Sequence, residues 1–248
     1  MMRFKIFAIV TALTLMGCEE EPPFIDLSEE QRVLKDTSYI LSDVPAAQPK
    51  NVLLEDISGV NCVNCPDAAA KAEEIKSKNN GRVIVSTMLP DKELLAEFTN
   101  PKGGFTDLTL PKVNELLSFI GQPSALPMGM INRGDYGNGF TMPFQRWDGH
   151  VDDELQLATT VNLEIEKELS SDGKDLFINI KATYTDDQTD QDQNISVYLV
   201  ENDIVGVQKG RTGTIQDYVF QHVVRDFASN AVGDPINVNL KHLILKNY

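Results

Sequence analysis

The residues best suited to chemistry in this sequence are two cysteines, Cys62 and Cys65, which form a C-x-x-C motif. Such a motif can be a redox pair, half of a zinc site or a structural disulfide. A zinc site takes four ligands, but the sequence has no second C-x-x-C and its 3 histidines are scattered. We therefore expect no metal and no other cofactor, and either thiol chemistry or a static disulfide.

The segments on both sides of the motif predict an α/β unit. Val52–Ile57 has the composition of a buried strand, and Cys62–Asn79 follows as a helix after a short turn. Val83–Thr87 is a second buried-type strand. A strand, a helix and a strand in this order predict a right-handed parallel crossover.

This placement favours thiol chemistry. A helix N-terminus carries a partial positive charge, which stabilises a thiolate there. We predict that Cys62 is the attacking thiol and that Cys65, one helical turn further on, is the more buried resolving thiol.

The spacing between strand and cysteines resembles that of the thioredoxin superfamily. Asp56 lies six residues before Cys62, where the resemblance implies a buried acid that relays protons to the resolving cysteine. A desolvated carboxyl has a raised pKa and can exchange protons near neutrality. Alternation places Asp56 on the same strand face as Leu54, which favours burial over the alternative of a solvent-facing acid at an edge.

Pro127 carries a second resemblance to that superfamily. It lies at the entrance of a predicted strand, Leu126–Ile131, as the cis-proline of thioredoxin-like folds does. The resemblance implies that Pro127 lies against the cysteine pair and shapes a groove for an extended substrate peptide.

A narrower resemblance covers roughly residues 50 to 245. It rests on Asn51–Gly59 with Cys62–Pro66, on Pro127–Arg133 and on Tyr218–Arg225. These segments resemble the family named outer membrane protein 28. The resemblance implies a lipid-anchored outer-membrane or surface protein with a thioredoxin-like domain followed by a β-sandwich.

The rest of the chain predicts two domains. Residues 50–159 form the thioredoxin-like domain, with an insertion at residues 88–111 and helices at 112–120 and 143–157. From residue 160 the apolar period changes to two, which predicts an antiparallel, immunoglobulin-like β-sandwich over 160–248. Within it we interpret His222 as a core or interface residue on one strand with Tyr218, Phe220 and Val224.

The N-terminus predicts export and lipidation. Arg3 and Lys5 precede an apolar run that is too short to span a bilayer, which takes about 20 residues. Leu15–Cys18 resembles the bacterial lipobox, whose cysteine is acylated, for example with palmitate. We predict a signal peptide at 1–17, lipid on Cys18, and a linker to residue 49. An ordinary signal peptide is the alternative.

Composition and charge limit the classes of partner that the chain can bind. With 42% hydrophobic and 24% charged residues, the chain has the composition of a folded domain. Its formal net charge is −15, and residues 1–17 contain two basic residues and no acidic one. A charge of this sign argues against nucleic acid as a partner, and membrane contact is expected through the lipid on Cys18. An outer-membrane location fits either a periplasmic or a cell-surface orientation.

Two functions fit these observations. The first is a thiol–disulfide oxidoreductase of the envelope that acts on protein thiols or disulfides through Cys62, Cys65, Asp56 and Pro127. The second is a surface binding or adhesion lipoprotein, in which Cys62–Cys65 is a structural disulfide. The second leaves the protein without an enzymatic activity, so the sequence alone does not decide whether it is an enzyme.

Overall fold

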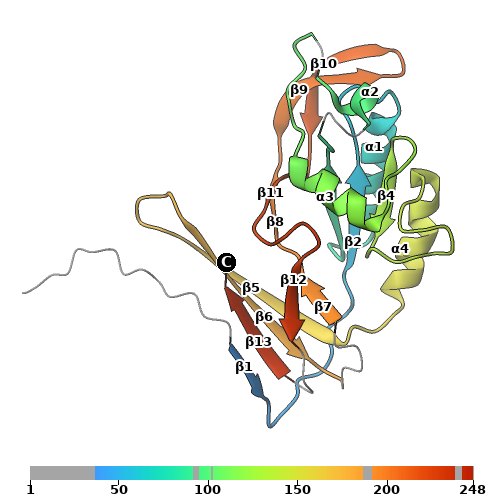
Figure 1. Cartoon of the computed structure of the whole chain (residues 1–248). Helices are drawn as coiled ribbons and strands as arrows, with labels where there is room; N and C mark the ends of the chain where they lie inside the picture. Colours follow the sequence, from blue (N-terminus) through green and yellow to red (C-terminus); the bar gives the residue numbers. More distant parts are fainter. Residues whose placement is uncertain (1–36, 92–94, 102, 187–191, 238–241, 248) are drawn as a thin grey trace, which may run out of the picture. The chain divides into compact units, whose positions relative to one another are not determined.

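The computed structural model describes residues 37–247 apart from 92–94, 102, 187–191 and 238–241. The predicted signal peptide, Cys18 and most of the linker therefore lie outside the described residues. The described part is a mixed α/β structure with many strands in several sheets and few helices (Figure 1). It lies within one compact unit of the chain, Leu34–Tyr248.

A five-stranded sheet carries the cysteine motif. Its strands, in spatial order, are β4 (Met128–Ile131), β2 (Val52–Ile57), β3 (Val83–Met88), β11 (Val223–Phe227) and β8 (Tyr198–Glu201). β2 pairs in parallel with β3 and antiparallel with β4. β11 is parallel to β3, and β8 is antiparallel to β11. The predicted parallel β2–helix–β3 unit is therefore present.

The helix after β2, α1 (Cys65–Lys78), begins three residues later than the sequence predicts. Pro66 explains the difference. Within the first helical turn a proline is tolerated, but a helix that began at Cys62 would place Pro66 in its interior, where the ring clashes and a donor is missing. Cys62 therefore lies in a turn, and the N–H of Cys65 donates to its carbonyl at 3.4 Å.

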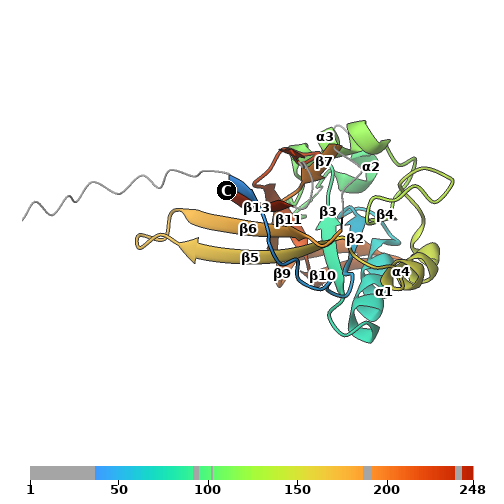
Figure 2. The same ribbon diagram turned by 90° about the horizontal axis from the view of Figure 1, so that it is seen from below.

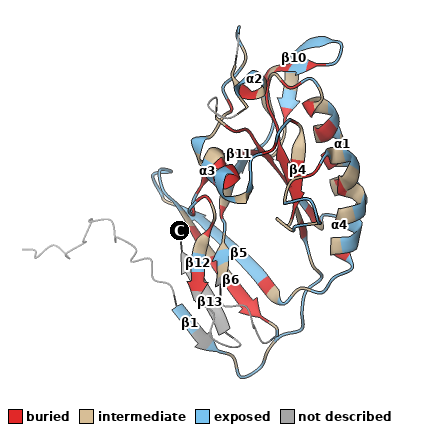
Figure 3. Ribbon diagram, turned by 45° about the vertical axis from the view of Figure 1, so that its right-hand side comes forward, coloured by how far each residue is buried: buried red, intermediate tan, exposed pale blue. Residues whose placement is uncertain are grey.

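Helices cover both faces of this sheet. α1 and α4 (Trp147–Leu155) pack on one face, where Trp147 is fully buried. α3 (Pro111–Ile120) packs on the other face through Val113, Leu116 and Leu117. α2 (Ala96–Thr99) and the 3-10 turn η1 (Phe144–Arg146) complete the helical elements among the described residues. Figure 3 shows the resulting concentration of buried residues in this part of the chain.

The strands after residue 160 correct the expectation that they form a sandwich of their own. β8 and β11 extend the sheet of β2 and β3 instead. On β11, Val223 and Val224 are at most 1% exposed, because they pack into the cores around the cysteine loop. An alternating pattern predicts a strand but does not specify which sheet the strand joins.

The remaining strands form one four-stranded sheet and two two-stranded sheets. The four-stranded antiparallel sheet has the order β1 (Thr37–Ile40), β13 (His242–Asn247), β6 (Leu176–Tyr184) and β5 (Val161–Leu169). β5 and β6 run side by side over their whole length (Figure 2). β9 (Ile204–Gly210) pairs with β10 (Gly213–Phe220), and β7 (Asp192–Ile195) with β12 (Asp234–Asn237).

Two local expectations are wrong. A single strand was expected over residues 195–199, whereas β7 ends at Ile195 and β8 begins at Tyr198. Tyr218 and Val224 were expected on one strand, whereas β10 ends at Phe220 and β11 begins at Val223. Among the described residues, no helix has both the length and the apolarity needed to cross a membrane.

Candidate functional site

The two cysteines form a disulfide whose Cα atoms are 5.4 Å apart. Cys62 and Cys65 are each only 1% exposed, so the expected difference in burial between an attacking and a resolving cysteine is absent. Both pack in one core cluster with Ile57, Met88 and Leu126. The disulfide is therefore enclosed by protein rather than presented at the surface.

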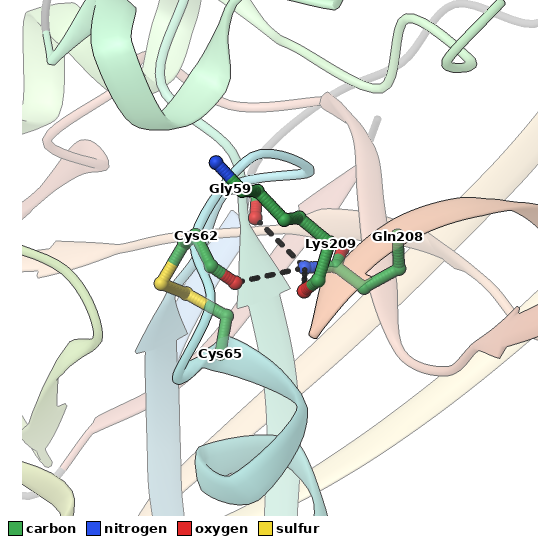
Figure 4. The surroundings of a disulfide bond; sticks show 5 residues. All are labelled: Gly59, Cys62, Cys65, Gln208 and Lys209. Carbon is green, nitrogen blue, oxygen red and sulfur yellow. Dashed lines mark hydrogen bonds between the residues drawn. A yellow bond between two sulfur atoms is a disulfide. The ribbon is translucent and has the colours of Figure 1, made fainter. Parts of the chain in front are cut away.

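The β9 strand covers one side of the cysteine loop. The side-chain amide of Gln208, itself 2% exposed, donates to the carbonyl oxygens of Gly59 at 3.2 Å and Cys62 at 3.1 Å. The backbone N–H of Lys209 donates to the carbonyl of Val60 at 2.9 Å. Figure 4 shows the Gln208 amide directed at the loop beside the disulfide. These contacts hold the loop against a strand from the far end of the sequence.

The segment at α2 covers another side. The N–H of Asn61 donates to the carbonyl of Phe98 at 2.8 Å, and the Asn61 side chain donates to the carbonyl of Asn100. At Gly59 an added Cβ would collide with the Phe98 backbone carbonyl. A glycine is needed there because the two backbones approach so closely. The predicted insertion at residues 88–111 thus contributes a lid-like cover of the motif.

Asp56 is fully buried on β2, as its alternation with Leu54 predicts. Neither of its carboxyl oxygens has a hydrogen-bond partner among the described residues. Burial raises the pKa of Asp56 from 3.8 to about 7, because an unpaired charge is poorly solvated inside the protein. A proton can therefore join or leave this carboxyl near neutral pH.

Tyr218 connects the surroundings of Asp56 with those of Cys65. Burial, with a contribution from the Asp56 carboxylate, raises the pKa of Tyr218 to about 12. Tyr218, Ser58 and Cys65 line one small cavity of about 20 Å³. A cavity of this size has room for about one water molecule.

Pro127 precedes β4, and the Leu126–Pro127 peptide bond is cis. The Leu126 side chain belongs to the same core cluster as both cysteines, and it is 6% exposed. The structure therefore brings together the cysteines and the Leu126–Pro127 segment. It buries the side chain of Leu126 against them.

One charged cluster was missed by the sequence analysis. Glu55, next to Asp56, is fully buried and accepts two hydrogen bonds at 2.9 Å from the guanidinium of Arg133. Tyr198 donates to the same carboxylate at 3.1 Å and also contacts Arg133. Burial raises the pKa of Glu55, and Arg133 opposes that rise. In the sequence, only the place of Arg133 in the segment Pro127–Arg133, which resembles the family, pointed to this cluster. It did not identify Glu55 as the partner.

His222 lies between β10 and β11 rather than on a strand face, and its φ is +57°. Its Nε2 lies 2.6 Å from a carboxylate oxygen of Glu73 and 2.8 Å from Nζ of Lys76, both on α1. The expected packing role is thus replaced by a polar contact with α1. In the described part of the chain, no group of three or more His, Cys, Asp or Glu side chains could hold a metal ion.

Comparisons with known proteins complete these observations. No curated protein matches the sequence. A crystal structure of a protein from Agrobacterium tumefaciens is similar at 12% identity, with a TM-score of 0.49, over 82% of this chain and 79% of that one. The family model described as outer membrane protein Omp28 matches residues 119–248, a region that begins after the cysteine motif. Since this match covers just over half of the sequence, the chain belongs to the outer membrane protein Omp28 family.

Proposed function

We propose that this protein is a lipid-anchored binding protein of the outer membrane, built on a thioredoxin-like body whose disulfide is static. The thioredoxin-like assignment is supported by the β2–α1–β3 crossover, by the antiparallel β4 and by the cis peptide before it. The same proposal includes a signal peptide, lipid on Cys18, a linker to residue 49 and a body that begins near residue 50. The family description supports the outer-membrane location.

The observation that carries the proposal is the burial of the disulfide. Thiol–disulfide exchange requires a thiolate to reach one sulfur of the disulfide directly. Here both cysteines are 1% exposed, and β9 and the α2 segment hold the loop that contains Cys62. A folded protein substrate cannot approach either sulfur in this arrangement. The motif then stabilises the loop, and the surface outside it is left for binding.

The reduction potential of the Cys62–Cys65 pair tests the proposal. A structural disulfide is expected below roughly −300 mV, whereas oxidoreductases have potentials of roughly −120 to −270 mV. The full chain should not reduce insulin, and Cys62→Ser should leave its envelope role unchanged. A potential in the oxidoreductase range together with insulin reduction would refute a static disulfide.

The buried Asp56 carboxyl favours a second candidate, thiol–disulfide exchange. Its pKa of about 7 suits proton transfer to a cysteine, and it lies on the strand that leads into the motif. In this candidate β9 and the α2 segment move away, and a dithiol reductant of the envelope first reduces the Cys62–Cys65 disulfide. The Cys62 thiolate then attacks a substrate disulfide and expels one substrate thiol, and Cys65 attacks the mixed disulfide. This step releases the second substrate thiol and restores the Cys62–Cys65 disulfide. A Cys65→Ser variant should then trap a mixed disulfide with an envelope protein. A Cys62→Ser, Cys65→Ser double variant, which has no thiol to trap with, is the control.

The lipid anchor has its own test. Cells that are fed labelled palmitate should label the wild-type chain and not a Cys18→Ala variant. Protease added to intact cells distinguishes the two orientations, because only a cell-surface domain is then cleaved. Labelling that persists in Cys18→Ala would contradict the anchor without bearing on the disulfide.

A further inference from the structure

The β5 strand is the end of the four-stranded sheet. It pairs with β6 over nine consecutive residues, Val161 to Leu169, and no strand pairs with its other edge among the described residues. The hydroxyl of Thr159 bonds to both the N–H and the C=O of Val161, so the open part of the edge lies beyond Val161. This part presents a row of unpaired backbone N–H and C=O groups. Such edges are templates on which an extended segment of another chain can form a further strand.

The two faces of β5 differ in chemistry. Leu163, Ile165 and Leu169 are 52%, 67% and 59% exposed, and they share one face with Lys167. Glu164 and Glu166 alternate with them and point to the other face, where Glu164 also forms an ion pair of 2.7 Å with Lys181 of β6. Figure 3 shows β5 as exposed along most of its length. A strand added at this edge would thus meet three apolar side chains and Lys167 on one face, and carboxylates on the other.

The apolar face of β5 borders a groove of about 880 Å³. Leu163 and Ile165 form part of its lining, and Ile84 and Phe119 from the five-stranded sheet and α3 contribute as well. Ile84 is 52% and Phe119 74% exposed, so apolar surface also remains open on that side. A volume of this size is within the range of specific ligand sites.

We propose that the β5 edge binds an extended segment of a partner protein in which apolar residues alternate with lysine or arginine. The backbone of the segment pairs with β5, its apolar side chains enter the groove beside Leu163 and Ile165, and its basic side chains face Glu164 and Glu166. Opposite charges across neighbouring strands stabilise such pairing. The net charge of −15 also attracts a basic partner.

Charge argues against a second copy of this chain at the same edge. In an antiparallel pair of β5 strands centred on Glu166, each Glu166 faces its copy and Glu164 faces Glu168. Like charges directly opposite one another destabilise strand pairing. A basic segment removes this repulsion, so it is the better occupant.

This inference deepens the proposed binding role by naming a partner class. It is tested with the full chain in detergent and a fluorescent peptide of alternating isoleucine and lysine, Lys-Ile-Lys-Ile-Lys-Ile-Lys. Fluorescence anisotropy should show saturable binding to the wild type. Ile165→Lys should weaken the binding at least tenfold, because it places a charge in the groove among the apolar side chains of the peptide. Glu166→Lys, on the other face, should weaken it by a similar factor.

Val205→Lys is the matched control, since Val205 is 62% exposed on β9, away from the β5 edge. It should bind the peptide like the wild type. A peptide N-methylated at alternate residues should bind at least tenfold more weakly when the blocked groups are those that pair with β5. Thermal unfolding of each variant shows whether it is folded. If Ile165→Lys does not fold, Glu166→Lys still tests the proposal.

Three results would overturn the proposal: no saturable binding, equal loss of binding in Val205→Lys, or insensitivity to N-methylation. A concentration-dependent dimer that Ile165→Lys abolishes, without peptide binding, would assign the edge to a second copy instead. Insulin reduction by the same preparation would refute the static disulfide but would not alter these binding outcomes. The two proposals can therefore fail separately.

Discussion

The side-chain amide of Gln208 donates a hydrogen bond of 3.1 Å to the carbonyl oxygen of Cys62, across 146 positions of sequence. The same amide also donates hydrogen bonds to the carbonyl oxygens of Gly59 and Lys209. One buried side chain thus satisfies the backbone of the cysteine loop. This contact makes the accessibility of the disulfide depend on a strand that is remote in the sequence.

Gln208→Ala should loosen the cover of the disulfide. The loop carbonyls that Gln208 satisfies would be left buried without a donor, which costs about 1–3 kcal/mol of unfolding free energy. The disulfide should also be reduced faster by dithiothreitol, as measured by maleimide labelling and mass spectrometry. Lys209→Ala is the control, since the Lys209 side chain is exposed and its backbone N–H is unchanged. Equal reduction rates in wild type and Gln208→Ala would show that β9 does not control access.

Gly59→Ala should disturb the α2 segment, which covers another side of the cysteine loop. The new Cβ would collide with the backbone carbonyl of Phe98, so the α2 segment must shift. We expect a loss of roughly 1–3 kcal/mol, as for other overpacked sites, and faster reduction of the disulfide. Gly149→Ala in α4 is the matched control, because its added Cβ meets open space. That control should be neutral or stabilising by about 0.5–1 kcal/mol. A Gly59→Ala chain as stable as the wild type would contradict the close approach.

The Asp56 carboxyl should make stability fall as pH rises. Its pKa is about 7 in the folded chain and 3.8 when unperturbed, so between these values the folded state binds a proton that the unfolded state has lost. The contribution is fully present below about pH 4 and is lost progressively up to about pH 7. Three units of pKa correspond to about 4 kcal/mol.

Asp56→Asn should remove this dependence, because an amide carries no charge to bury. Urea unfolding between pH 4 and pH 8 measures the difference. The free energy of unfolding of the variant should exceed that of the wild type most at the upper end of this pH range. Asp217→Asn, at an exposed position on β10, is the control and should keep the wild-type slope. If the free energy of unfolding of Asp56→Asn depended on pH as that of the wild type does, another group would be responsible for the dependence.

Arg133→Met should leave the Glu55 carboxylate buried without its cation. Removal of one partner of a buried ion pair destabilises proteins by about 3–5 kcal/mol. The double variant Glu55→Gln, Arg133→Met removes both charges and should recover much of that loss. A double-mutant cycle by urea unfolding measures the coupling. Additive effects of the two substitutions would show that the pair contributes little.

Much of the cysteine unit could be predicted from local sequence. The apolar run before the motif, the helix after it and the second strand were all recognisable, because residue spacing along a strand or helix determines which side chains share a face. The burial of Asp56 followed from its alternation with Leu54, and the position of Pro127 before β4 followed from the strand after it. The family was also recognisable, since its characteristic segments are short and contiguous.

Only the tertiary structure decided how the motif is enclosed. Gln208 on β9, the Phe98 carbonyl beside Gly59, and the pairing of Glu55 with Arg133 join segments that are distant along the chain. The membership of β8 and β11 in the sheet of β3 is another such choice. Periodicity specifies the faces of an element but not its neighbours, because strand partners are selected by packing of the whole core. The sequence by itself thus determined a cysteine pair at the start of a helix, and the fold decided that this pair is buried.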